Sequence, residues 1–245
     1  MRARELLRRT GFDLTRHPHA KTLTGELGRV LHLERWTAVL DVGANVGQFA
    51  TSMRRMGYRG PLVSFEPDSA SIATLADASA SDANWHIRPV ALGRASGEAV
   101  LHQFIGSDLS SLHNALPGTV KRFKNAVPTG TSTVQVRTLL DFHSEIRELA
   151  PVGPWLLKCD TQGHDLDVLE GGLGNMAEVS TVLTELSVIP LYEAQPSMSV
   201  VLERMAEWGF LPIGMFPVSR TADGLGVIEF DGLFTRADRE PRLGL

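Results

Sequence analysis

The sequence has little of several features that would each indicate a particular class of protein. Cys159 is its single cysteine, so no disulfide can form within the chain. This is compatible with a reducing compartment, and we expect a cytoplasmic protein. No stretch approaches the roughly 18 consecutive apolar residues that suggest a membrane span. The basic N-terminus MRARELLRRTGFDL lacks the apolar run of a signal peptide. A solvated helix is favoured there, although Leu6 and Leu7 leave peripheral membrane contact open.

An excess of positive charge is also missing. The sequence has 24 Lys and Arg residues against 28 Asp and Glu residues, for a net charge of -4. Because general affinity for nucleic acid needs a basic face, we predict no nucleic-acid partner. The dinucleotide fingerprint G-x-G-x-x-G and the Walker sequence Gly-Lys-Ser/Thr are absent as well. This weakens a nicotinamide-dependent oxidoreductase as an alternative function.

What the sequence does contain is a regular alternation of buried strands and helices. Such alternation over 245 residues, 43% of them hydrophobic, predicts one α/β domain with a mostly parallel sheet covered on both faces. The last two strands predict an antiparallel hairpin. The polar segment 106–130 is expected to be a long functional loop. Extended segments are predicted at 37–42, 62–65, 85–90, 99–104, 134–138, 155–159, 180–186, 210–216 and 227–235, and helices up to residue 35 and at 48–56, 69–79, 139–150, 165–171 and 197–208.

The strongest motif is LDVGANVGQFA at residues 40–50, in which a buried strand leads through two glycines into a helix. Glycine permits a tight turn and close approach of a ligand to the backbone. The acidic-x-G-x-x-x-G spacing suits a compact ligand with an amino acid end and no pyrophosphate. A turn that serves strand–helix packing alone is the less favoured interpretation. The cofactor-binding residues predicted from this motif are Asp41, Gly43, Ala44, Asn45, Gly47, Gln48 and Phe49.

Two further strand ends are candidates for the same site, since ligands of open α/β sheets bind beyond the carboxyl ends of the strands. Glu66, followed by Pro67 and Asp68, can accept both hydroxyls of a ribose. Ala91 and Leu92 end the third strand and can sandwich an adenine, although ordinary core packing explains them nearly as well.

A fourth motif, at residues 156–172, brings polar groups to the end of another buried strand. Asp160, Gln162 and His164 follow this strand, and Asp165 is placed to cap the next helix. His164 is a candidate general base because an imidazole titrates near neutral pH. An unpaired surface histidine is the alternative.

Taken together, these motifs resemble the FkbM family of S-adenosylmethionine-dependent methyltransferases. The resemblance spans residues 36–236, which we take as the methyltransferase domain, with 1–35 as an N-terminal helical extension and 237–245 as a tail. Gln162 departs from the acidic residue expected at its position. The matching segments are DVGANVG at Asp41, FEPD at Phe65, ALG at Ala91, SSL at Ser110, KCDTQGHDLDVLEGG at Lys158, TEL at Thr184, WGF at Trp208 and DGLFTR at Asp231.

The resemblance implies a Rossmann-like class I methyltransferase fold with a seven-stranded sheet, S-adenosylmethionine as cofactor, and O-methylation of a sugar, glycolipid or natural product. We expect Ser110 and Ser111 near the cofactor and a small-molecule or glycolipid acceptor. The leading base is His164, with Asp160 and Glu185 as the other options. A non-catalytic protein that retains the cofactor site stays open.

A divalent metal is possible but not favoured. Asp160, Asp165 and Glu185 could supply oxygen ligands to magnesium, yet two of them can equally serve as caps or ion-pair partners. Lys158 lies within its strand and is expected to pair with a carboxylate.

Overall fold

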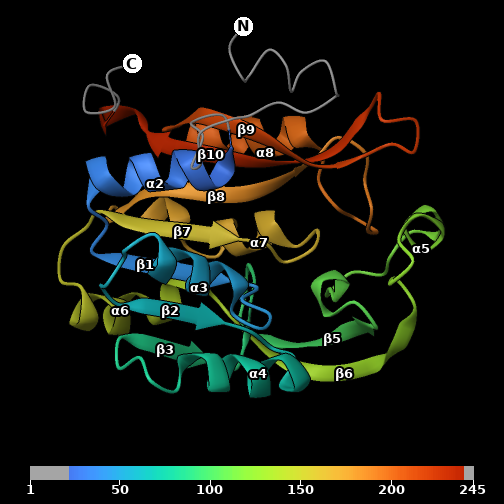
Figure 1. The fold of residues 1–245 in the computed structure, drawn as a ribbon, viewed down its shortest axis with the longest axis horizontal. Coiled ribbons are helices and arrows are strands. Elements are labelled where there is room, and N and C mark those ends of the chain that lie inside the picture. The colour runs from blue at the N-terminus through green and yellow to red at the C-terminus, as the bar shows by residue number, and fades with distance from the viewer. Residues whose placement is uncertain (1–21, 240–245) are drawn as a thin grey trace, which may run out of the picture.

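A seven-stranded sheet forms the centre of the molecule (Figure 1). The computed structural model describes residues 22–239. The strand order in this sheet is β3-β2-β1-β7-β8-β10-β9, and β10 is antiparallel to both of its neighbours. The predicted parallel sheet with a C-terminal antiparallel hairpin is therefore confirmed. The strands are β1 Ala38–Val42, β2 Leu62–Phe65, β3 Trp85–Arg88, β7 Trp155–Cys159, β8 Val179–Ser187, β9 Phe210–Arg220 and β10 Val227–Arg236.

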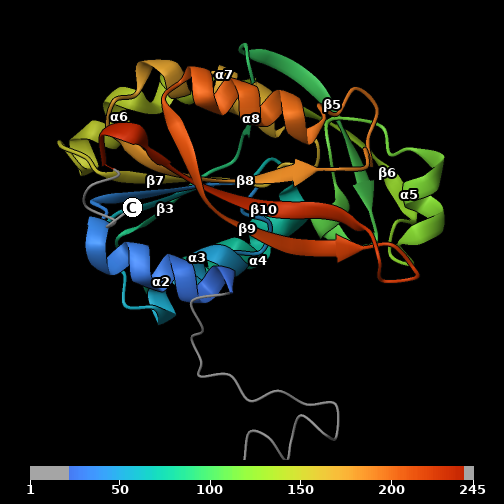
Figure 2. The same ribbon diagram turned by 90° about the horizontal axis from the view of Figure 1, so that it is seen from above.

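Helices cover both faces of this sheet (Figure 2). The helices α2, α3 and α4 lie on one face, and α6, α7 and α8 lie on the other. A strand between two helical layers must be apolar on both sides, and every residue of β1, β2 and β7 is buried. The helices are α2 Leu23–Glu34, α3 Gln48–Arg55, α4 Ser69–Ser79, α6 His143–Leu149, α7 Asp165–Glu170 and α8 Met198–Glu207, with short 3₁₀ turns Leu139–Phe142, Leu173–Asn175 and Ala237–Arg239.

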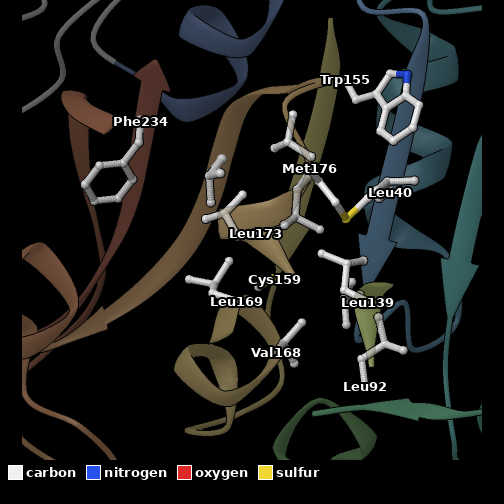
Figure 3. Packing of buried hydrophobic residues seen from close by; sticks show 14 of the residues in the cluster. Leu40, Leu92, Leu139, Trp155, Cys159, Val168, Leu169, Leu173, Met176 and Phe234 are labelled. Atoms are coloured by element: carbon white, nitrogen blue, oxygen red, sulfur yellow. The ribbon is translucent and has the colours of Figure 1, made fainter. Parts of the chain in front are cut away.

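The largest core cluster lies between the sheet and α6, α7 and α8 (Figure 3). Leu40, Trp155 and Phe234 project into it from three strands. Val168 and Leu169 meet them from α7. Burying a side chain of this size stabilises a fold by roughly 1.5–3 kcal/mol. The cluster therefore fixes the carboxyl end of β7 and the start of α7, which carry the candidate site.

The predicted N-terminal helix is present as α2 and belongs to the second core cluster. Leu27 and Val30 are buried in it. The Thr22 hydroxyl accepts a hydrogen bond from the Gly25 amide at the start of the helix, and Arg35 ends it in a left-handed conformation. The basic segment with Leu6 and Leu7 and the last residues of the tail, 240–245, lie outside the described residues.

The expectation of a long loop at 106–130 is wrong in part. Residues 107–109 form a 3₁₀ turn, Pro117–Arg122 forms the helix α5, and Pro128 already begins β6. The strands β5 (Gly97–Phe104) and β6 (Pro128–Arg137) pair with each other and with β4 (Ala91–Leu92) in a separate three-stranded sheet. This small sheet stands beyond the carboxyl ends of the main strands (Figure 1).

Helix length and composition also bear on membrane insertion. Over residues 22–239, no helix combines the length and the apolar character required to cross a bilayer.

Candidate functional site

A cavity opens at the carboxyl ends of β1, β2 and β7, against the small sheet. Most of the predicted cofactor residues border it. Asp41, Gly47, Asp68 and Glu185 do not border it and have other contacts. The predicted residues in its wall are Gly43, Ala44, Asn45, Gln48, Phe49, Glu66, Pro67, Ala91, Leu92, Ser110, Ser111, Asp160, Gln162 and His164.

The two glycines of the first motif allow close packing within the protein, and Gly43 also borders the cavity. Both have positive φ, 70° at Gly43 and 87° at Gly47. A Cβ atom on Gly43 would lie 1.9 Å from the Asp160 carbonyl oxygen, so this glycine lets β1 and β7 end side by side. A Cβ atom on Gly47 would lie 2.9 Å from Leu75 and 3.0 Å from Trp85. Gly47 therefore allows α3 to start close to Leu75 and Trp85, and its predicted contact with the cofactor stays a prediction.

Glu66 is positioned by backbone amides at the end of β2. Its Oε2 accepts a hydrogen bond from the Asn45 amide at 2.7 Å, and its Oε1 accepts one from the Asp68 amide at 2.8 Å. Burial raises the pKa of Glu66, and these two amides oppose that rise. A carboxylate has about four acceptor sites, so both oxygens retain lone pairs for hydroxyl donors in the cavity.

Asp68 has a structural role instead of the predicted ligand contact. Its side chain accepts the Ser71 amide and so caps α4. It also accepts a 2.6 Å hydrogen bond from the Gln103 side chain on β5. Asp68 therefore joins the main domain to the small sheet from outside the cavity wall.

Asp41 and Lys158 form a buried ion pair, in which Lys158 borders the cavity and Asp41 lies behind it. Their Oδ1 and Nζ atoms lie 3.1 Å apart, and Lys158 also donates to the Gly43 carbonyl oxygen at 2.8 Å. Burial lowers the pKa of Lys158, but the charges of Asp41 and Asp160 outweigh it and leave the pKa raised. The predicted pairing of Lys158 with a carboxylate is confirmed. Asp41 thus holds Lys158, which in turn holds the Gly43 carbonyl group, and Asp41 does not itself reach the cavity.

The turn after β7 is held by a network that the sequence did not reveal. The Gln162 side chain donates to Asp160 Oδ1 at 2.9 Å and accepts from the Tyr192 hydroxyl at 2.9 Å. The Ser111 hydroxyl donates to the Gln162 carbonyl oxygen at 2.5 Å. Tyr192 is 30 residues from Gln162, in a segment with no motif, so no local pattern could have indicated it. Asp165 does not cap α7: it accepts the Thr161 amide at 3.1 Å and is the first residue of the helix.

Acidic side chains from three adjacent strands meet at one end of the cavity. Glu185 on β8 is the strand-register partner of Asp231 on β10. In the β7–β8 register Cys159 is the partner of Thr184, so the next residues along the two strands are Asp160 and Glu185. Burial, followed by the charge of Asp160, raises the pKa of Asp231 to about 7. Burial and Asp160 also raise the pKa of Glu185. Asp160 and Asp231 border the cavity, whereas Glu185 Oε2 is buried behind it without a hydrogen-bond partner in the described part of the chain.

His164 borders the cavity, but its ring is turned toward protein groups. Its Nδ1 lies 3.1 Å from His113 Nε2 and 3.6 Å from Asp167 Oδ2. A Cβ atom on Gly93 would lie 3.0 Å from His164 Nε2, so the opposite edge of the ring is also packed. Burial lowers the pKa of His164, which keeps the imidazole neutral at pH 7.

Apolar side chains complete the wall of the cavity. The predicted Ala91 and Leu92 are joined there by Phe65, Val90, Leu101 and Leu112. The cavity therefore has an apolar side that fits a flat aromatic ring, a carboxylate that fits vicinal hydroxyls, and an acidic end.

Comparison with known proteins places the chain in a family. A sequence model described as the methyltransferase FkbM domain matches residues 41–212, and the chain belongs to this family of methyltransferases. It is also 26% identical over 186 residues to the 2-O-methyltransferase NoeI of Sinorhizobium fredii, an alignment that covers 73% of this chain and 74% of that protein.

Solved structures with a similar fold include other methyltransferases. The magnesium protoporphyrin IX methyltransferase ChlM of Synechocystis, with bound SAM, is 9% identical with a TM-score of 0.48, covering 87% of this chain and 77% of that one. An rRNA methylase of Streptococcus thermophilus is 9% identical with a TM-score of 0.46, covering 92% and 99%. Neither likeness identifies a substrate.

Proposed function

We propose that the chain is an S-adenosylmethionine-dependent O-methyltransferase that acts on a hydroxyl of a sugar, glycolipid or natural product. The observation that carries the proposal is the cavity itself, where a carboxylate, an apolar wall and an acidic end follow one another along the strand ends. Family membership supports methyl transfer, and the name of the NoeI relative supports oxygen as the acceptor atom. We keep the cytoplasm as the expected location.

The lining of the cavity supports a place for each part of the cofactor. Glu66 would hold the ribose hydroxyls, because its oxygens are already fixed by two backbone amides. Phe65, Val90 and Leu92 would enclose the adenine, and the glycine turn would receive the amino acid end. When bound, the cofactor supplies a methyl group on a positively charged sulfur. The acidic end near Asp160 favours positive charge there.

The acidic end also suits a polyhydroxyl acceptor. Carboxylates accept hydrogen bonds from hydroxyl groups, and Asp160 and Asp231 both reach the cavity wall. Several fixed acceptors on one side would orient a sugar ring, and alignment of two reactants supplies a large part of a rate enhancement. We therefore favour a sugar hydroxyl over a nucleic-acid acceptor, for which the acidic wall offers no phosphate contact.

We propose Asp160 as the general base, in preference to His164. The Asp160 side chain is 46% exposed, and its Oδ1 is oriented by Gln162. Both edges of the His164 ring are occupied by protein groups. In the transfer, the acceptor oxygen forms a bond to the methyl carbon, the carbon–sulfur bond breaks with its electron pair kept by sulfur, and Asp160 takes the hydroxyl proton. Asp231, with its pKa near neutrality, can take up that proton in turn.

An assay with labelled methyl donor tests this function. Wild-type protein should label a glycoside or glycolipid acceptor, and Asp160→Asn should reduce turnover by about 100-fold or more while cofactor affinity is retained. His164→Ala is the matched comparison, and we expect the smaller loss there. Cofactor binding without transfer to any hydroxyl acceptor would support the non-catalytic alternative. Normal turnover of Asp160→Asn with loss of activity in His164→Ala would return the role of base to His164.

A further inference from the structure

Three side chains with metal-ligating atoms converge beside the cavity. His113 lies in the segment after β5, His164 lies in the turn after β7, and Asp167 lies in α7. One donor atom from each lies within 4.8 Å of the other two. Among the residues that the structure describes, this is the group with the spacing of a metal site. It differs from Asp160, Asp165 and Glu185, the set considered from the sequence.

The distances between these donor atoms are close to those between neighbouring ligand atoms around a bound metal ion. In a tetrahedral shell, zinc–nitrogen and zinc–oxygen bonds of about 2.0–2.2 Å place neighbouring ligand atoms roughly 3.3–3.6 Å apart. His164 Nδ1 lies 3.1 Å from His113 Nε2 and 3.6 Å from Asp167 Oδ2. Without a metal, the short nitrogen–nitrogen contact requires one neutral ring to donate to the other. A cation between the two rings would instead bind the lone pair of His164 Nδ1 and the lone pair of His113 Nε2.

A neighbouring cation orients the carboxylate of this group. Arg94 lies 3.1 Å from Asp167 Oδ1, which leaves Oδ2 turned toward His164. An ion pair to the oxygen that does not bind the metal orients a ligating carboxylate. All three residues are half-buried, so an ion and one water molecule can reach them.

We propose that His113 Nε2, His164 Nδ1 and Asp167 Oδ2 bind one divalent transition-metal ion of the zinc type, with water as a fourth ligand. Two imidazoles and one carboxylate suit zinc and its neighbours better than magnesium, which prefers oxygen ligands. The ion would have a structural role, because it would join the segment that carries Ser110 and Ser111 to the turn that carries Asp160 and Gln162. This proposal stands independently of the methyl acceptor.

Zinc titration of the full-length, chelator-treated protein tests the site. We expect one Zn²⁺ per chain and a rise in Tm of about 5–10 °C when Zn²⁺ is a hundredfold above its Kd. His113→Ala and Asp167→Asn should each weaken binding by more than about 10-fold and reduce the rise in Tm. His32→Ala is the matched control, since it removes an imidazole from the exposed side of α2 and should leave both values unchanged.

Visible absorption of bound Co²⁺ provides a second measurement of metal binding, one that does not depend on the stability of the protein. Wild-type protein should show the intense bands of a four-coordinate ion, and Asp167→Asn, which keeps the size of the side chain, should reduce them. The proposal would be overturned by no Zn²⁺ binding to wild-type protein. It would equally be overturned if His113→Ala and Asp167→Asn bound Zn²⁺ as tightly as wild type, since the ion would then lie elsewhere.

Discussion

Glu66, the residue that we propose binds the ribose, is held in place by the protein itself. It is 7% exposed, and backbone amides of Asn45 and Asp68 hold its two oxygens. Burial of a carboxylate is unfavourable unless hydrogen bonds compensate it. The two amides supply part of that compensation, and hydroxyl groups of a bound ribose would supply more. The orientation of Glu66 is therefore already suited to the cofactor.

We expect Glu66→Ala to weaken binding of S-adenosylmethionine by about 10- to 150-fold, the equivalent of a lost charged hydrogen-bond partner. Calorimetry measures this affinity. Asp68→Ala is the control, because it removes a helix cap worth about 1 kcal/mol from the same segment without changing the cavity wall. Equal losses of affinity in both variants would mean that Glu66 supports the turn and does not bind the ribose.

For single residues, the sequence predicted which side chains lie at the cavity better than it predicted what each of them contacts. Glu66, Asp160 and Gln162 were placed at strand ends by pattern alone, and all three border the cavity. Gly43 was expected to admit a ligand, yet the atom it admits is the Asp160 carbonyl oxygen. That contact joins two strands far apart in the sequence. A local motif cannot distinguish a glycine that faces a ligand from one that faces its own protein.

At the scale of elements, residues 105–127 between β5 and β6 determine how the cavity is closed. Tyr192 OH lies 3.0 Å from the Leu109 carbonyl oxygen, and the Leu116 amide donates to the Leu191 carbonyl oxygen at 2.8 Å. Buried Leu109 and Ala126 form a small apolar cluster of their own. Polar contacts also hold the segment to the turn after β7 at Gln162 and to Asn45, and its buried side chains lie outside the main core. Elements with so few buried apolar contacts open at low free-energy cost.

We predict that this segment closes over the bound cofactor as a lid. Hydrogen exchange of amides in residues 107–112 should slow when S-adenosylmethionine is added, because Ser110 and Ser111 border the cavity. Amides of α8, on the opposite side of the sheet from α3, provide the internal reference and should exchange at the same rate in both states. Equal exchange at residues 107–112 with and without cofactor would contradict a lid.

The prediction of this region from sequence failed for a physical reason. Alternating strands and helices identify elements that pack locally, and that signal correctly predicted a mostly parallel sheet with a C-terminal antiparallel hairpin. The small sheet instead pairs β5 with β6, and Gly97 faces Val136 across a loop of more than twenty residues. α5 has six residues, one of them Gly118, so its helical pattern is too short to recognise.

At the scale of the whole molecule, the acidic residues at the cavity end should make stability depend on pH. Asp160, Glu185, Glu229 and Asp231 repel one another, and Lys158 is the cation that lowers the pKa of Asp231. Burial and this repulsion raise the pKa of Asp231 to about 7, above the usual value of about 3.9. A carboxyl group whose pKa is higher in the folded state binds more protons there than in the unfolded chain. Its stabilising contribution is complete below pH 4 and is lost as the pH rises through 7.

Asp231→Asn should remove this loss, because an amide cannot ionise. Measured by urea unfolding, the free energy of unfolding of the variant relative to wild type should increase by about 1–2 kcal/mol between pH 5 and pH 8, less than the full pKa shift implies, since neighbouring carboxyls readjust. Asp77→Asn is the matched control. Its side chain is exposed on α4, so the same change of charge should give a difference that is independent of pH. If the two variants respond to pH alike, the Asp231 carboxyl is ionised throughout this range, and the repulsion within the acidic group is relieved by solvent.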